Sequence, residues 1–159
     1  MGKHFDVDAY MKEEHFDDII ATHLLEKMKQ DPTVVGLTAG VPGIPGFNPQ
    51  RRAEAGKQFI DVGIAEEHMV AMAAGIAKNG GKPVILDAAT FLQRTYDQLM
   101  QDMALNNNAV TILSFPLGGG ISPMDATHSS AFDLAMMSTI PNLRVLSPAT
   151  KAELLAMLD

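Results

Sequence analysis

The sequence predicts a three-layer αβα domain with a mostly parallel central sheet. Two observations support this fold class: short apolar segments rich in Val and Ile alternate with segments of helical periodicity, and the apolar segments read as continuous runs. Continuous runs are typical of strands in a sheet that helices cover on both faces. The length of 159 residues suffices for one buried core, so we expect a single domain.

The first expected helix covers residues 14–30, where apolar side chains recur at helical spacing: Phe16, Ile19, Ile20, Leu24, Leu25 and Met28. The β-branched run at 33–39 predicts the first strand. The Pro- and Gly-rich stretch at 40–49 predicts a loop, and it is too short to divide the chain into two domains.

Four more strands are expected in the apolar runs QFIDVG, KPVILDAA, AVTILSF and LRVLSP. The helices between them are expected at 66–79, 90–106 and 130–138, and a last helix from Thr150, where a Ser/Thr cap precedes a leucine face. Ligands of such folds bind beyond the carboxyl ends of the strands. A site is therefore expected in the loops after DVG, LDAA and LSF.

The composition excludes several function classes. With 47% hydrophobic residues, 19% charged residues and a formal net charge of −7, the chain has the composition of a soluble globular protein, which argues against a nucleic-acid backbone as partner. The sequence has no cysteine and no HExxH, which excludes thiolate metal sites and disfavours zinc. It has neither a hydrophobic signal core nor an apolar run of bilayer length, so a cytoplasmic location is expected.

The stretch FIDVGIAEEHMVAMAAGIAKNGG combines an apolar helix with two glutamates at its start. Helical spacing places Glu66 on the stripe of Met69, Val70, Ala73, Ile76 and Ala77, at the edge of a buried face. One interpretation is that Glu66 and Glu67 complement the helix dipole, which is worth ~0.3–1 kcal/mol. The other is that one of them meets a hydrogen-bonding nitrogen of a ligand.

Two further groups of residues follow predicted strand ends. On a helix from Thr90, the expected core stripe is Leu92, Tyr96, Leu99 and Met103, while Phe91 and Arg94 share another face as either a solvated pair or the wall of a pocket for a flat ring and an anion. His128 ends a Gly-rich loop that lacks the GxxxxGK[ST] and GxGxxG patterns, so this histidine is either structural or part of the site.

Taken in order, GIAEEH, TFLQRTYDQ, THSSAFD and IPNLRVLSPATKAEL resemble the pyrimidine-binding domain of the transketolase superfamily, most of all that of the 1-deoxy-D-xylulose-5-phosphate synthases. The resemblance runs from about Val35 to the end. It implies thiamine diphosphate as cofactor, with Glu66 hydrogen-bonded to N1′ of the aminopyrimidine. That bond favours the imino tautomer, whose exocyclic nitrogen takes the proton from the thiazolium C2.

The resemblance also implies roles for the other candidate residues. Phe91 packs on the aminopyrimidine, and Ile64 and Met69 form a supporting wall of the cofactor site. Arg94 holds an anionic substrate, and His128 reaches the reacting carbonyl. Glu66 and His128 are therefore the expected catalytic residues, and no residue of the chain is expected to bind a metal.

The resemblance implies further domains as well. Members bind the diphosphate and its Mg²⁺ through a domain marked by GDG, which this sequence lacks. Residues 1–159 are thus expected to be a fragment of a longer enzyme without its diphosphate-binding and C-terminal domains, inactive alone. The expected partners are that diphosphate-binding domain, a sugar-phosphate substrate and a second copy in a homodimer. The apolar 69–77 helix with Gly75 is the expected subunit contact.

The exact activity stays open at this level. The synthases have a Tyr where this chain has Ala88, an Asp-Arg where it has SFPLGG, an Asp that aligns with Met124 or Asp125, and a Gly where it has Ser130. Candidate activities are the decarboxylating condensation of pyruvate with glyceraldehyde 3-phosphate, that of a paralogue on a related sugar phosphate, and a transketolase-type ketol transfer. The alternatives are a non-catalytic dimerisation or regulatory module and a flavodoxin-like effector binder.

Overall fold

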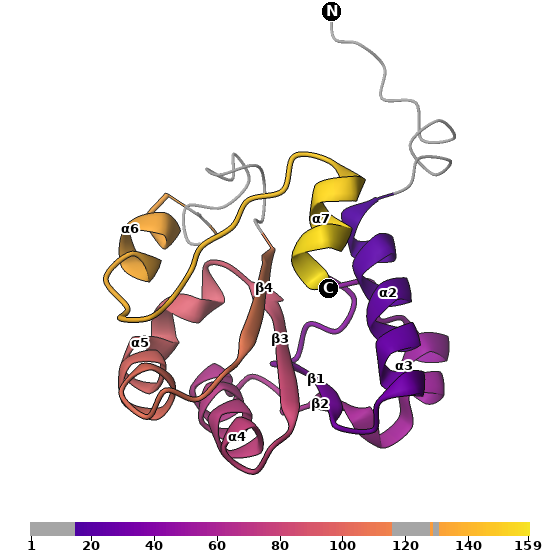
Figure 1. Cartoon of the computed structure of the whole chain (residues 1–159), viewed down its shortest axis with the longest axis horizontal. Coiled ribbons are helices and arrows are strands. Elements are labelled where there is room, and N and C mark those ends of the chain that lie inside the picture. The colour runs from indigo at the N-terminus through magenta and orange to yellow at the C-terminus, as the bar shows by residue number, and fades with distance from the viewer. Residues whose placement is uncertain (1–14, 116–127, 129–130) are drawn as a thin grey trace, which may run out of the picture.

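The computed structural model of the chain describes residues 15–115, 128 and 131–159. Four strands form one sheet in the order β2-β1-β3-β4, and every neighbouring pair is parallel. The strands are β1 (Val34–Thr38), β2 (Phe59–Asp61), β3 (Lys82–Ala88) and β4 (Thr111–Phe115). The carboxyl ends of all four strands therefore lie at one edge of the sheet, which in Figure 1 is the upper edge.

Helices cover both faces of the sheet, which confirms the predicted three layers (Figure 1). On one side lie α2 (Phe16–Gln30), α3 (Pro49–Ala55) and α7 (Lys151–Leu158). On the other lie α4 (Glu66–Lys78) and the winding helical segment of η2 (Phe91–Thr95), α5 (Tyr96–Gln98) and η3 (Leu99–Ala104). The short α6 (Asp133–Met137) lies beyond α5, and η1 (Gly56–Gln58) leads into β2.

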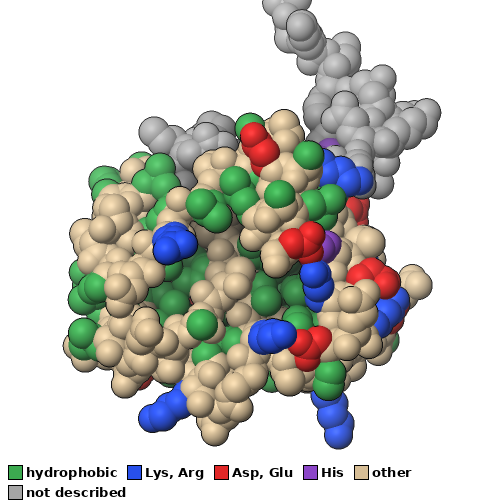
Figure 2. Space-filling model, viewed as in Figure 1, with side chains coloured by type: hydrophobic (Ala, Val, Ile, Leu, Met, Phe, Trp, Pro, Cys, Tyr) green, Lys and Arg blue, Asp and Glu red, His purple; other side chains and the backbone are tan. Residues whose placement is uncertain are grey.

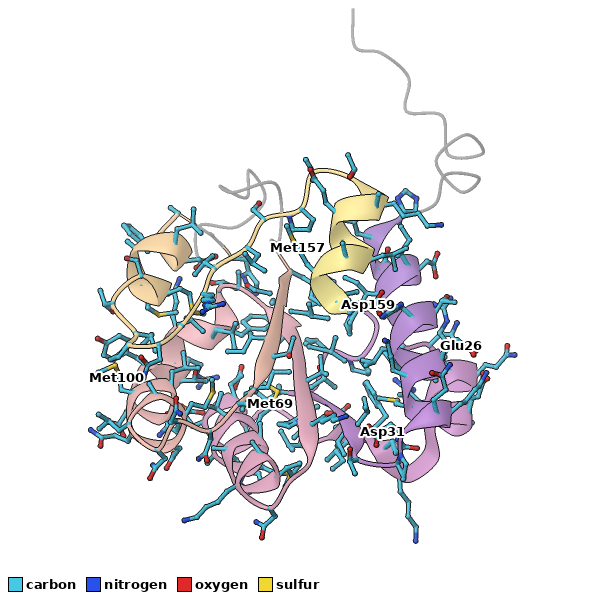
Figure 3. The ribbon with its side chains drawn as sticks, in the orientation of Figure 1. Glu26, Asp31, Met69, Met100, Met157 and Asp159 are labelled. Atoms are coloured by element: carbon cyan, nitrogen blue, oxygen red, sulfur yellow. The ribbon has the colours of Figure 1, made fainter. Side chains whose placement is uncertain are left out.

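The two faces of the sheet bury separate hydrophobic clusters. On the α4 side, Leu37 and Ile85 of the sheet pack with Met69, Val70 and Leu92. On the α2 side, Leu86 of the same strand β3 packs with a set of helical and loop residues that includes Ile20, Leu24, Leu25 and Phe47. Figure 3 shows Met69 reaching from α4 toward the sheet. The neighbours Ile85 and Leu86 thus serve opposite faces, as the two-residue period of a strand requires.

The predicted helix at 90–106 exists, but its winding changes along its length. It begins as a 3₁₀ turn, passes through one α-helical turn and ends as a π-helix. With three residues per turn at the start, the residue after Leu92 on the buried face is Thr95 and not Tyr96. Thr95 is fully buried and Tyr96 is 42% exposed, so the predicted core position of Tyr96 is wrong; those of Leu92, Leu99 and Met103 are confirmed.

Two other local predictions need correction. The run LRVLSP is not a strand: residues 143–148 adopt neither helix nor strand, and a cavity of about 490 Å³ lies between them and β4. The stretch at 40–49 is a loop as predicted, but it leads into the unpredicted helix α3, whose first residue is Pro49 and whose cap is Asn48, accepting from the Arg51 amide at 2.9 Å.

The cap predicted for the last helix is confirmed. The Thr150 hydroxyl accepts the Glu153 amide at 3.2 Å, and the Glu153 carboxylate accepts the Ala149 amide at 2.8 Å. Among the described residues, none of the helices has both the length and the apolar character needed to span a bilayer.

Candidate functional site at the carboxyl edge of the sheet

Glu66 occupies the first turn of α4, five residues past the end of β2. It is only 2% exposed, and it shares its helix with the fully buried Met69, Val70 and Ala73, so the predicted stripe is confirmed at these positions, whereas Ile76 and Ala77 are only partly buried. A carboxylate in such surroundings loses most of its hydration, so it is stable as a charged group only if hydrogen-bonding or cationic partners replace the lost water. Since α4 begins at the carboxyl edge of the sheet, Glu66 lies where ligands of this fold class bind.

Arg94 donates a hydrogen bond to that carboxylate. Its Nη1 donates to Glu66 Oε2 at 3.3 Å, and its Nε lies 4.0 Å from Glu67 Oε1. The side chains of Arg94 and Glu67 are both about half exposed, whereas that of Glu66 is buried. The guanidinium therefore bridges two glutamates at the rim and keeps donors available to an incoming anion.

Phe91 lies one 3₁₀ turn before Arg94, and side chains three residues apart eclipse one another in a 3₁₀ helix. The two therefore share a face, as predicted. The ring of Phe91 meets the ring of His128 at a centroid distance of 5.5 Å and an interplanar angle of 80°, an edge-to-face contact. The structure thus brings together two predicted site residues that are far apart in the sequence. His128 has further interactions as well.

Ile64 lies in the loop between β2 and α4 and is 82% exposed. Its neighbour across the loop is Gly40, where an added Cβ would lie 3.2 Å from the Ile64 side chain. Gly40 also has a φ of +81°, which favours glycine. Ile64 is therefore an apolar side chain presented on the rim, available to a flat ligand. Met124, Asp125 and Ser130, at which the sequence departs from the synthase pattern, lie outside the described residues.

Asp61 shapes the two loops that flank this rim. Its Oδ1 accepts the backbone amides of Gly40 at 2.8 Å and Gly63 at 2.9 Å. One carboxylate therefore joins the loop after β1 to the loop after β2. Both donors are backbone amides, so Asp61 holds the two loops together independently of the side chains around it.

Asp87, at the end of β3, is the residue that the sequence interpretation missed. It is fully buried; its Oδ1 accepts the amide of Ala88 at 2.7 Å, while its Oδ2 has no hydrogen-bond partner among the described residues. Burial raises the pKa of Asp87 to about 7, and the charges of Glu66 and Asp61 raise it too, against the hydrogen bond from the Ala88 amide. The only sequence signal is an acid that interrupts the apolar run KPVILDAA.

The described residues contain no group of three or more acidic or histidine side chains arranged to hold a metal ion. What the edge does offer is a buried carboxylate, a second buried carboxyl group, a cation and an aromatic pair. Such a set can hold a proton at a defined place, stack a flat ring and attract an anion.

Several hollows lie elsewhere on the described part of the molecule. A hollow of about 620 Å³ lies between α2, α7 and the amino ends of β3 and β4, and the 490 Å³ cavity lies beside residues 143–148. Figure 2 shows hydrophobic side chains gathered in the hollowed face between the helices. Neither hollow is lined by a predicted site residue, so the candidate site is the open rim at the carboxyl edge.

Fold and candidate site together define a class: a doubly wound α/β domain with a buried carboxylate at a helix start beyond the carboxyl ends of parallel strands. The comparison with protein families gives the particular member of that class. Residues 15–159 match the family described as "Transketolase, pyrimidine binding domain". The chain belongs to this family, which confirms the resemblance and the fold class expected from the motifs.

The chain is also similar to curated 1-deoxy-D-xylulose-5-phosphate synthases. The one from Chlorobaculum tepidum is 36% identical over 99% of this chain and 24% of its own length. The one from Anaeromyxobacter sp. strain Fw109-5 is 39% identical over 90% of this chain and 22% of its own length. The chain therefore spans about a quarter of the length of these relatives.

The chain is similar in fold to solved structures of transketolases. One of them, a split-gene transketolase in an inactive β4 tetramer, has a TM-score of 0.73 at 26% identity, and the match covers 89% of this chain and 45% of the other. A transketolase from Pichia stipitis has a TM-score of 0.77 at 19% identity, over 90% of this chain and 23% of its own. The second resemblance is one of fold alone.

Proposed function

We propose that this chain is the pyrimidine-binding part of a thiamine-diphosphate-dependent transferase, with Glu66 as the residue that holds the cofactor's aminopyrimidine. The observation that carries the proposal is the burial of the Glu66 carboxylate at the carboxyl edge of the sheet, in a chain of this family. A helix dipole alone does not require a glutamate to be 2% exposed, since Glu67 beside it is half exposed.

The residues of the rim fit an aminopyrimidine. Glu66 would accept or share a proton with a ring nitrogen, Phe91 would pack on the face of the ring, and Ile64 would cover its apolar side. When bound, thiamine diphosphate supplies the nucleophilic carbon that attacks the substrate carbonyl. Low dielectric around Glu66 strengthens its hydrogen bond and holds the ring in one orientation.

We propose that Arg94 and His128 serve the substrate. Arg94 is half exposed while its Nη1 contacts Glu66, so it can bind an anionic substrate group without leaving the rim. His128 lies against Phe91, which keeps the imidazole next to the ring site, where it can donate to the substrate carbonyl oxygen. The diphosphate and Mg²⁺ would be bound by a diphosphate-binding domain that this chain does not contain.

The favoured reaction is the decarboxylating condensation of pyruvate with glyceraldehyde 3-phosphate, which yields 1-deoxy-D-xylulose 5-phosphate. It is favoured because the curated relatives are named 1-deoxy-D-xylulose-5-phosphate synthases. A ketol transfer of the transketolase type is the second candidate, favoured by the solved structures of similar fold. The first measurement is carbon dioxide release by the complete enzyme with thiamine diphosphate, Mg²⁺ and both substrates.

The test compares wild type with Glu66→Gln and, as a matched control, Glu67→Gln. We expect Glu66→Gln to lower turnover by ~10²–10⁴-fold, the range for loss of a positioned proton-transfer group, and Glu67→Gln to stay within a few-fold of wild type. Equal losses in both variants would contradict the role of Glu66. Cofactor binding without carbon dioxide release would favour ketol transfer, and absence of cofactor binding would favour a non-catalytic module.

We also propose that α4 forms a contact between copies of the chain. Gly75 is exposed with open space around its Cα, and Met72 and Ile76 beside it are only partly buried, so another backbone can approach the helix closely. Sedimentation should show a dimer that Gly75→Leu disrupts. A monomer at tens of micromolar would remove this proposal.

A further inference from the structure

Asp61 lies at the point where strands β1 and β2 separate. The two strands are paired in register up to Thr38 and Asp61, and the Val62 amide donates to the Thr38 carbonyl oxygen at 3.0 Å. Beyond that point the Asp61 side chain joins the two segments, since its Oδ1 accepts the amides of Gly40 at 2.8 Å and Gly63 at 2.9 Å. This carboxylate therefore fixes how far the loops after β1 and β2 open.

The loop held at Gly63 leads directly into Glu66. The Gly63 carbonyl oxygen accepts the Ala65 amide at 2.8 Å, and the Ala65 carbonyl oxygen accepts the Met69 amide at 3.0 Å. Ala65 is the N-cap of α4, and its methyl side chain cannot cap the helix as a Ser or Asp would. The first turn of α4, which contains Glu66, is thus connected to Asp61 through a continuous series of hydrogen bonds.

The loop held at Gly40 supports Ile64. A Cβ added to Gly40 would lie 3.2 Å from the Ile64 side chain and 3.4 Å from the Ile64 amide nitrogen, so the two loops are in close contact there. Both amides that donate to Asp61 belong to glycines in the left-handed region, with φ of +81° at Gly40 and +73° at Gly63. The same carboxylate therefore also places the apolar side chain of the rim.

We propose that Asp61 is a positioning residue of the ring site, which acts through Glu66 and Ile64. By holding Gly40 and Gly63 together, it fixes the buried carboxylate and the apolar side chain relative to each other. A carboxylate suits this task, because its hydrogen bonds with backbone amides are shorter and stronger than those of a neutral acceptor. The role rests on the proposed function, since the two side chains are the ones proposed to contact the aminopyrimidine.

The first test is amide hydrogen exchange, followed by NMR in the 159-residue chain without cofactor. We expect the amides of Gly40 and Gly63 to exchange at least about tenfold more slowly in wild type than in Asp61→Ala, the size of one hydrogen bond to a charged group. Asp61→Asn should keep most of this protection, because its amide oxygen can accept the same two bonds. Glu54→Ala, which removes an exposed carboxylate of α3, is the matched control and should change neither rate.

The second test uses the complete enzyme with thiamine diphosphate, Mg²⁺ and both substrates. Asp61→Ala should raise the half-saturating concentration of thiamine diphosphate and lower turnover by ~10–10²-fold, since misplacing a contact group by about 1 Å can cost that much. Asp61→Asn should recover most of both. A residue that only stabilised the fold would reduce the amount of active enzyme, and hence turnover, but would leave the half-saturating concentration unchanged.

Two results would overturn the proposal: a Gly63 amide that exchanges equally fast in wild type and Asp61→Ala, or an unchanged half-saturating concentration of thiamine diphosphate in Asp61→Ala. If Asp61→Ala does not fold, Asp61→Asn decides: protected amides support the proposal, and amides that exchange as fast as an unbonded one contradict it. The exchange experiment needs no cofactor, so its outcome is distinct from that of the proposed function, which the comparison of Glu66→Gln with Glu67→Gln tests.

Discussion

An aspartate lies at each end of the sheet, and the two have opposite surroundings. Asp31 lies just before β1 at the amino end, and Asp87 lies near the end of β3 at the carboxyl end. At the amino end, Asp31 accepts from the Lys82 ammonium at 2.8 Å and from the amide and hydroxyl of Thr33. Those bonds lower the pKa of Asp31 below its usual range. At the carboxyl end, burial raises the pKa of Asp87 to about 7, and one of its oxygens has no hydrogen-bond partner in the described part of the chain.

The difference shows that the carboxyl end of the sheet, and not the amino end, contains a group that lowers the stability of the fold. The amino end is closed by bonds that serve the fold, and Figure 3 shows Asp31 there, at the far end of α2. Gln58 closes it further, its amide nitrogen lying within 3.0 Å of the carbonyl oxygens of Met28, Asp31 and Val34. The carboxyl end keeps a carboxyl group that weakens the fold at neutral pH, which is expected of a ligand site.

The largest expected effect comes from Asp87→Asn, measured as the free energy of unfolding in urea at pH 4 and pH 8. The folded pKa of about 7 exceeds the ordinary 3.8, so wild type loses stability as pH rises from about 4 to about 7. Asp87→Asn has no carboxyl group at this position and should not lose that stability. The unfolding free energy of the variant minus that of wild type should therefore increase from pH 4 to pH 8 by at most about 4 kcal/mol, at about 1.4 kcal/mol per pKa unit. If both proteins show the same pH dependence, Asp87 does not differ from an ordinary carboxylate.

A medium effect is expected from Gln58→Ala at the opposite end. Three part-buried hydrogen bonds to carbonyl oxygens are lost, although the Asp31 oxygen still accepts the Val34 amide at 3.2 Å, and the loss should cost about 1–3 kcal/mol of unfolding free energy at every pH between 4 and 8. Lys57→Ala, on the exposed neighbour, is the control and should be neutral. A cost of Gln58→Ala that changes with pH would mean that the two ends of the sheet are coupled.

The smallest effect is expected from Lys82→Met. The Lys82 ammonium is well exposed, so its ion pair with Asp31 is screened by water and salt, and Thr33 still donates to the carboxylate. We expect no resolvable change in the urea midpoint at physiological salt. A loss as large as that of Gln58→Ala would show that the amino end depends on charge and not on backbone bonding.

Features that depend on local periodicity could be predicted from the sequence. Glu66 was identified because a 3.6-residue period places it above Met69 and Val70, and the structure keeps α4 regular. The position of Tyr96 was predicted with the same period and is wrong, because the chain there starts as a 3₁₀ turn. Nothing in the local sequence announces that change of winding.

Features that depend on distant neighbours could not be predicted. Whether residues 143–148 pair with β4 depends on how segments distant in the sequence pack around them, which no local pattern encodes. Asp87 resembles an ordinary strand terminus until the structure places Glu66 and Asp61 around it. The contact of Phe91 with His128 likewise exists only in three dimensions, although the resemblance had assigned both residues to one site.

The strand order has a consequence for how the chain is made. Strand β1 lies between β2 and β3, yet the residues of β3 follow those of β1 only after β2 and α4. At a synthesis rate of ~5–20 residues per second, one edge of β1 waits for several seconds before its second neighbour exists. During that interval the backbone N–H and C=O groups of that edge are unpaired and can pair with other unpaired strands, so β1 is a point at which the nascent chain is exposed to aggregation.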